Sequence, residues 1–159
     1  MKQNGKWLEW LAAGSLTVAV FLFFLFFYPY HNLLKEQMTL FLHTQDHFIS
    51  YLEKPAWLTG YAGDLLTQCF IMPAGGAILV SLSLLTLWLL FRKAFRSFGM
   101  RPIVASAVAA IPVAVEFLFH CGLHYPLSST FSTLLALCFF LLFIRIRNRH
   151  LYICLFLPV

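Results

Sequence analysis

Three ionisable residues recur at helical spacing in the segment VAVEFLFHCGLH, residues 113–124. Glu116, His120 and His124 are each four residues apart, so they share one face if the segment is helical. A carboxylate and two imidazoles in a row can relay a proton or a cation, or form a pair that faces a cavity. The structural alternative is that Glu116 is satisfied by His120 and by a neighbouring helix. The solvent around the segment decides which chemistry is open to it.

A second group of polar side chains lies in HTQDH, residues 43–47. His43 and His47 are four residues apart with Asp46 between them, and two imidazoles at this spacing on a helix can bind a metal ion. No Glu follows His43, so the segment lacks the HExxH pattern of metalloproteases. The interpretation we favour is the solvated face of a helix at the membrane surface.

Three acidic residues of the segment 31–67 are candidates for catalysis: Glu36, Asp46 and Asp64. Carboxylates near a membrane surface can bind a metal ion and assist transfer of a glycan from a lipid carrier. The alternative is that they are solubilising charges and that Asp64 caps a helix. The sequence therefore leaves open whether the protein is an enzyme.

The composition shows which solvent these residues meet. The chain has 159 residues, of which 61% are hydrophobic and 11% charged. A soluble domain carries about 25% charged residues, so a soluble enzyme is excluded. The four cysteines lie in or near apolar segments without a CxxC pattern, so neither a metal site nor a disulfide framework is predicted. No cofactor is predicted either.

Long uncharged apolar stretches predict an all-α polytopic transmembrane protein. The four expected spans cover about residues 10–29, 68–91, 102–121 and 127–144. After the basic segment 145–150 the chain becomes apolar again in LYICLFLPV, which is too short to cross a bilayer. This tail either lies at the interface or starts a fifth span. We favour the second reading and expect the N-terminal fragment of a longer protein.

The distribution of Lys and Arg predicts the orientation. All of them except Lys35 and Lys54 lie in the N-terminal tail, the connection 92–101 and the segment 145–150. These three stretches share one side if there are four spans, and the positive-inside rule places that side in the cytoplasm. We therefore expect a bacterial inner-membrane protein with a cytoplasmic N-terminus. Its net charge of +5 is explained by anionic lipid, without a nucleic-acid partner.

The outer loop, residues 31–67, is expected to hold an amphipathic helix of about five turns. Apolar and polar residues recur on opposite faces until Pro55, which predicts a helix lying in the outer-leaflet interface. The glycines of LTGYAGDLL then predict a turn, with Asp64 as the cap of the helix that follows. In the second span, Pro73, Gly75 and Gly76 predict a kink or a close helix contact.

Three segments of the loop carry a resemblance: KEQMTLF (35–41), KPAWL (54–58) and YAGDLLTQCF (61–70). They resemble the front end of an uncharacterised, domain-of-unknown-function family of bacterial polytopic inner-membrane proteins, best over residues 7–91. Cys69 departs from the pattern, in which an aromatic residue is expected. The resemblance implies one span, an outer loop and many further spans. Its loop layout is similar to that of type C glycosyltransferases, which carry acidic residues there.

Three functions remain open on the sequence. The first is a component of cell-envelope or lipid-linked glycan assembly that acts at the outer leaflet. The second is a transporter subunit that uses the intramembrane Glu116–His120 pair. The third is a truncated piece without function of its own. The expected partners are membrane lipid and either the downstream spans of the full-length protein or other membrane subunits.

Overall fold

The computed structural model describes residues 4–39 and 41–146, and the elements within them are all helical. The order is α1 (Asn4–Phe26), α2 (Pro29–Met38), α3 (Gln45–Leu52), α4 (Trp57–Thr67), the short 3₁₀ helix η1 (Gln68–Ile71), α5 (Gly75–Ser97), α6 (Pro102–His120) and α7 (Leu127–Arg145). The expected tail after residue 146 lies outside the described residues.

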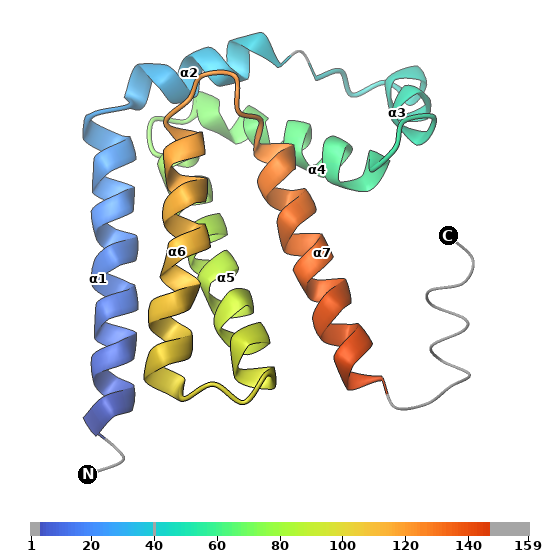
Figure 1. Cartoon of the computed structure of the whole chain (residues 1–159). Helices are drawn as coiled ribbons and strands as arrows, with labels where there is room; N and C mark the ends of the chain where they lie inside the picture. The colour runs from blue at the N-terminus through green and yellow to red at the C-terminus, as the bar shows by residue number, and fades with distance from the viewer. Residues whose placement is uncertain (1–3, 40, 147–159) are drawn as a thin grey trace.

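Four of these helices are long and apolar enough to cross a membrane: α1, α5, α6 and α7. The predicted all-α transmembrane fold is therefore confirmed. The start of α1, the α5–α6 connection and the end of α7 lie at one end of the bundle, while α2, α3 and α4 run across the other end (Figure 1). We call these the inner and the outer end, after the orientation expected from the sequence.

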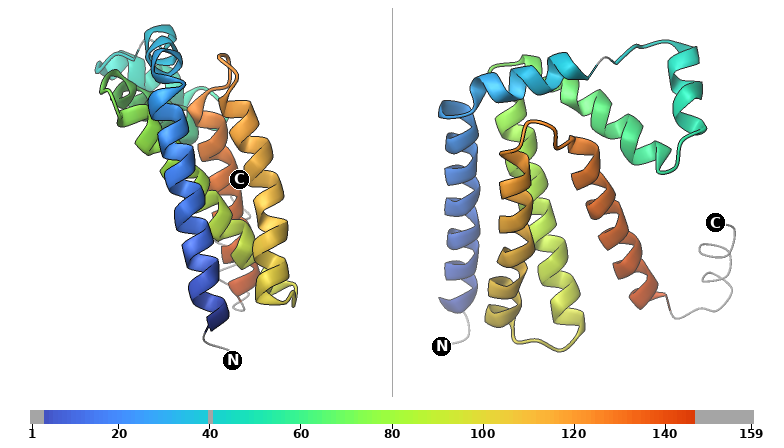
Figure 2. Two further views of the ribbon diagram at one scale, coloured as in Figure 1. Left: turned by 90° about the vertical axis from the view of Figure 1, so that its left-hand side faces the viewer. Right: turned by 45° about the horizontal axis from the view of Figure 1, so that its top comes forward.

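Helix α5 forms the centre of the bundle. In its apolar stretch 44% of the residues are buried, compared with 11% in α1 and in α7. It packs against α1, α6 and α7, and its buried side chains include Val80, Leu84 and Leu87. The right-hand view in Figure 2 shows α7 diverging from α5 and α6 toward the inner end. The exposed apolar faces of α1 and α7 suit lipid or further helices, because exposing such large apolar surfaces to water is energetically unfavourable.

Helix α2 turns its polar face toward the protein. Its buried residues are Asn32 and Lys35, whereas Leu34 and Met38 are exposed. A helix on a water-soluble protein would show the opposite pattern. The inversion fits a helix whose outer surface meets an apolar medium. It also carries the amine of Lys35 into the interior, beneath the outer loop.

The prediction of one five-turn helix in the outer loop is wrong in one respect, because the structure has two separate helices there. Helix α2 ends at Met38 and α3 begins only at Gln45. The Thr44 hydroxyl accepts a hydrogen bond from the backbone N–H of His47 at 3.3 Å and so starts a new helix. Side-chain caps of this kind compete with continuous helix, and the apolar periodicity does not reveal them.

The prediction of a turn in LTGYAGDLL is also wrong, because these residues lie in α4. Asp64 therefore lies inside a helix and does not cap one. The glycines serve packing: a Cβ on Gly63 would lie 2.5 Å from the Cα of Ser128 at the start of α7. Helix α4 approaches α7 this closely only because that position has no side chain.

The break at Pro73 was correctly anticipated, since α5 begins only at Gly75. A Cβ on Gly76 would lie 2.9 Å from side-chain atoms of Asn32 on α2. The small residue therefore permits the expected close helix contact. This contact fixes α2 over the outer end of α5 and so determines where Lys35 lies.

Candidate functional site

Two of the three residues of the predicted relay meet in a buried network at the outer end of α6. Glu116, His120 and Thr130 are 7%, 1% and 0% exposed. The Thr130 hydroxyl donates to Oε1 of Glu116 at 2.6 Å, and Nε2 of His120 lies 2.8 Å from the same hydroxyl oxygen. A threonine of α7 therefore joins the two ionisable residues of α6.

The hydroxyl of Thr130 has a single proton, which fixes the direction of this chain. While that proton points to Glu116, the hydroxyl oxygen accepts from the Nε2–H of His120. If Glu116 takes up a proton, the reversed order Glu116 to Thr130 to His120 is also fully hydrogen-bonded. In both directions the Thr130 hydroxyl, Oε1 of Glu116 and Nε2 of His120 stay hydrogen-bonded, so the arrangement suits either protonation state of the carboxyl group.

Tyr125 extends the network toward the surface. Its hydroxyl donates to Oε1 of Glu116 at 2.8 Å, and its ring packs edge-on against the ring of His120. Burial raises the pKa of Tyr125 to about 12, and the hydrogen bond to Glu116 acts in the same direction. Tyr125 thus remains a hydrogen-bond donor throughout the physiological pH range.

A small pocket of about 130 Å³ opens above the network, at the outer end of the bundle. It is enclosed by residues of α2, α4, η1 and the α6–α7 turn. The polar side chains around it include Lys35, Thr39, Asp64, Thr67, His124 and Tyr125. Tyr125 belongs both to this outer pocket and to the buried network, so it links the pocket to Glu116.

Lys35 of α2 lines the outer pocket and contacts the end of α6. Its Nζ donates to the backbone carbonyl of His120 at 3.0 Å. Burial lowers the pKa of Lys35 to about 8, and only the nearby Cys121 acts against this shift. The pKa of His31, one turn before Lys35, is also lowered by burial and by the lysine charge. The outer pocket therefore holds an amine that can release its proton near neutral pH.

The other predicted site residues are not gathered around this network. His124 is exposed and lines the outer pocket, outside the buried chain. Of the three acidic candidates, Asp64 lines the outer pocket and accepts a 2.5 Å hydrogen bond from the hydroxyl of Tyr51. Glu36 is half-buried on α2, and Asp46 is exposed in the first turn of α3. These three carboxylates do not converge on the outer pocket.

The two histidines of HTQDH do not share a helix face. His43 precedes α3, so the spacing that would aim both imidazoles at one metal ion does not arise. Both rings instead pack edge-on against Phe41, at 5.1 and 5.3 Å between centroids. Within residues 4–39 and 41–146, no group of three or more His, Cys, Asp or Glu side chains has the arrangement of a metal site.

Sequence reasoning missed three members of the site: Lys35, Tyr125 and Thr130. A signal existed for each. Lys35 follows His31 at helical spacing, Thr130 belongs to a run of hydroxyl residues at the start of the last span, and Tyr125 lies in the turn beside Glu116. An intramembrane carboxylate needs such donors, so polar residues at the ends of neighbouring spans are the place to search.

A second carboxylate lies at the inner end. Glu9 of α1 forms an ion pair with Arg92 of α5, and both side chains are nearly buried. The guanidinium lies 5.6 Å from the ring of Trp10 and 5.3 Å from that of Trp88. Glu9 was assigned no role from the sequence. It connects α1 to α5 where the two helices approach the inner surface.

Comparison with known protein families gives a match over nearly the whole chain. The model of a family described as a family of unknown function (DUF6057) covers residues 5–159. The expected membership of an uncharacterised family is thereby confirmed. No curated protein and no solved structure matches the chain.

Proposed function

Because the chain belongs to DUF6057, a family of unknown function, we propose a function from the site itself: a proton-coupled component of a membrane transporter. In this proposal Glu116 takes up and releases a proton at the outer end of the bundle. Tyr125 connects it to the outer pocket, and Thr130 connects it to His120. The protonation of Glu116 is coupled to what occupies the pocket.

One observation carries this proposal: the Thr130 hydroxyl bridges Glu116 and His120 with all three side chains buried. A purely structural carboxylate in a membrane helix needs donors alone. This carboxylate has a partner that can donate or accept, followed by an imidazole that can do the same. An isolated ionised carboxylate costs several kcal/mol in a membrane interior, so its hydrogen-bond partners decide its charge state.

The test is infrared difference spectroscopy on the protein in lipid nanodiscs. Acidification is expected to produce a carbonyl stretching band of a buried protonated carboxyl group. The band should disappear in Glu116→Gln and remain in Glu36→Gln, a matched change of a half-buried carboxylate outside the network. In Thr130→Val the band should shift, because Glu116 loses a hydrogen-bond partner. A band that persists in Glu116→Gln, or no band in the native chain, would overturn the proposal.

A second candidate function is envelope or lipid-linked glycan assembly at the outer leaflet. The observation in its favour is that Lys35, Asp64 and His124 line one pocket beneath an interfacial helix. An amine and an imidazole suit the phosphate of a lipid carrier, with Asp64 as an acid or base. This function predicts that Asp64→Asn abolishes complementation of a deletion strain while protein levels stay normal. The proton-coupled function instead places the critical loss at Glu116→Gln.

We further propose that the protein lies in a bacterial inner membrane with its N-terminus in the cytoplasm. In support, Arg92, Lys93 and Arg96 lie in the last two turns of α5 and Arg101 directly precedes α6, and the α5–α6 connection lies at the end of the bundle where α1 begins (Figure 1). We also propose that further spans or other subunits cover α7, whose apolar surface is largely exposed. Reporter fusions after residues 40 and 98 test the orientation. Activity of a periplasmic reporter should appear at residue 40 alone.

A further inference from the structure

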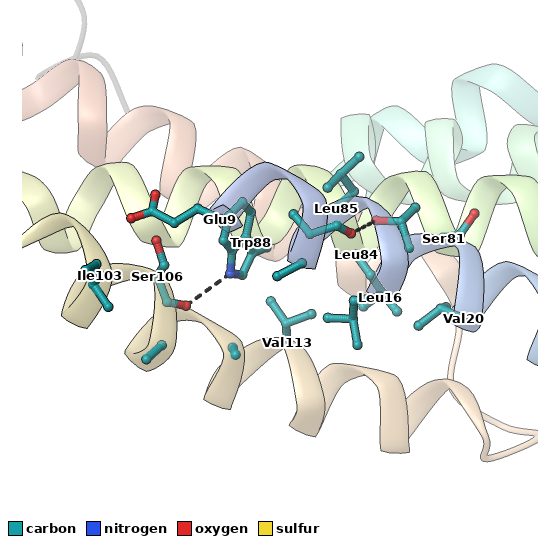
Figure 3. A pocket seen from close by; sticks show the side chains of 15 residues that line it. Glu9, Leu16, Val20, Ser81, Leu84, Leu85, Trp88, Ile103, Ser106 and Val113 are labelled. Atoms are coloured by element: carbon teal, nitrogen blue, oxygen red, sulfur yellow. Dashed lines mark hydrogen bonds between the residues drawn. The ribbon is translucent and has the colours of Figure 1, made fainter. Parts of the chain in front are cut away.

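An apolar groove runs between α1 and α6 from the inner end of the bundle to beyond its middle, with α5 as its floor (Figure 3). Its volume is about 350 Å³. Leu16 and Val20 line it from α1, Leu84 and Trp88 from α5, and Ala110 and Val113 from α6. Glu9 and Trp88 mark one end of the groove and Val20 the other. None of the residues of the outer pocket takes part.

The dimensions of the groove select among possible occupants. The wall of α1 from Glu9 to Val20 has twelve residues, and the eleven steps between them span about 16 Å at about 1.5 Å per residue. Over that length the groove offers about 350 Å³ between apolar side chains, which suits one extended hydrocarbon chain. It lies between membrane-spanning helices, where lipid chains are the surrounding solvent.

The inner end of the groove is polar and basic. Arg92 contacts both Glu9 and the ring of Trp88, and its Nε is buried without a hydrogen-bond partner. Glu9 balances the charge of Arg92. The exposed Arg96 and Arg101 carry the remaining positive charge. Arg96 lies one helical turn after Arg92, and Arg101 lies two residues before Ile103, which lines the groove. This end therefore attracts an anion.

We propose that the groove binds one acyl chain of an anionic phospholipid, whose phosphate lies at the basic inner end. The hydrocarbon chain follows the apolar walls toward Val20. It supplies the van der Waals contacts that the side chains lining an empty groove lack. Arg96 and Arg101 select the anionic headgroup. The bound lipid completes the contact between α1 and α6.

Trp88 provides a direct probe, since it lines the groove and is only 8% exposed. The experiment uses the full chain with Trp7, Trp10 and Trp57 changed to Phe, in nanodiscs of zwitterionic lipid. A tenth of the lipid is phosphatidylglycerol with brominated chains, which quench tryptophan on contact. We expect Trp88 to be quenched at least threefold more than by the same fraction of brominated phosphatidylcholine.

Variants separate the chain site from the headgroup site. Ala110→Phe fills the groove and should reduce quenching severalfold, while the matched Ala136→Phe on the exposed face of α7 should leave it unchanged. The double change Arg96→Gln and Arg101→Gln should remove the preference for phosphatidylglycerol but keep quenching by both lipids. Absence of quenching in the starting protein overturns the proposal without reference to any variant. Equal quenching by the two lipids overturns the headgroup assignment.

Discussion

The two ends of the bundle each hold a carboxylate, and they satisfy it differently. At the outer end Glu116 is held by the neutral hydroxyls of Thr130 and Tyr125. At the inner end Glu9 is held by the guanidinium of Arg92. Hydroxyls serve either protonation state of a carboxyl group, whereas a guanidinium has donors only. This difference is what the proposed function uses: the partners of Glu116 suit a carboxyl group that exchanges a proton, whereas the partner of Glu9 suits a carboxylate alone.

Packing follows the same division. At the outer end, α4 touches α7 at Gly63 and α2 touches α5 at Gly76, with no space for a Cβ at either position. Near the middle of α1, by contrast, Gly14 is exposed and has no atom within 4 Å of its Cβ position. The outer end is closed by direct contact between helices. Toward the inner end, the apolar groove between α1 and α6 leaves room for a ligand.

The largest effect is expected from a substitution that breaks the Glu9–Arg92 ion pair. Arg92→Gln should lower the free energy of unfolding by about 3 kcal/mol, because it leaves Glu9 nearly buried and without its counter-charge. The double variant with Glu9→Gln should recover much of this loss. Denaturation in mixed detergent micelles measures the coupling. A coupling energy near zero would mean that the pair is solvated and that the two ends do not differ in this respect.

Gly63→Ala should cost about 2 kcal/mol of stability, since its methyl group would overlap the backbone of α7 at Ser128. Gly14→Ala is the matched change in α1 and should be neutral or stabilising by up to about 1 kcal/mol, through helix propensity. Thermal unfolding of both variants compares a glycine at a close helix contact with an exposed glycine. If the two changes had equal effects, the proposed difference in packing would be wrong.

Glu116→Ala should cost about 1.5 kcal/mol, because the hydroxyls of Thr130 and Tyr125 lose their acceptor. Glu116→Gln keeps an acceptor oxygen and should cost less than half of that. Unfolding in micelles distinguishes the two. A glutamine variant as unstable as the alanine variant would show that the charge of Glu116 is itself structural, in contrast to the proposal.

The last effect is a pH dependence of stability that comes from Lys35. Its pKa is about 8 in the folded protein and 10.5 ordinarily, so the unfolded chain binds more protons between these values. Stability should therefore rise from pH 8 to pH 10. Above pH 10 it should fall, because the pKa values of Tyr51 and Tyr125 are raised to about 12 and their unfolded forms ionise first.

The measurement uses a Cys121→Ala background, because burial raises the pKa of Cys121 and would oppose the rise above pH 9. Lys35→Met in that background should flatten the profile between pH 8 and pH 10. The exposed Lys54→Met is the control and should leave the rise intact. A rise that survives in Lys35→Met would assign it to another group.

The membrane helices could be predicted because lipid imposes one strong requirement on sequence. Uncharged apolar length is enough to identify them, and the last two begin at the expected residues 102 and 127. The first two are displaced by several residues toward the inner end. Helix ends depend on local hydrogen bonds and close contacts, such as the contact at Gly76, that hydropathy does not register.

The outer loop was less predictable because tertiary contacts override its local signals. Gly60 and Gly63 read as a turn, yet both lie in α4, where absent side chains permit contact with Tyr51 and with α7. The site was predicted only in part for a similar reason. The spacing of Glu116 and His120 lies within one helix, whereas Lys35 and Thr130 reach them from α2 and α7. One sequence does not reveal such pairings.

The inverted face of α2 has a consequence for synthesis. The Lys35 amine donates a hydrogen bond to the backbone carbonyl of His120, 85 residues later in the chain. At 5–20 residues per second, a ribosome takes roughly 4–17 s to cover that distance. Until then the carbonyl that Lys35 contacts has not been synthesised. The Lys35 hydrogen bond therefore forms only after the third membrane helix has arrived, and the network around Glu116 waits for Thr130 of the fourth.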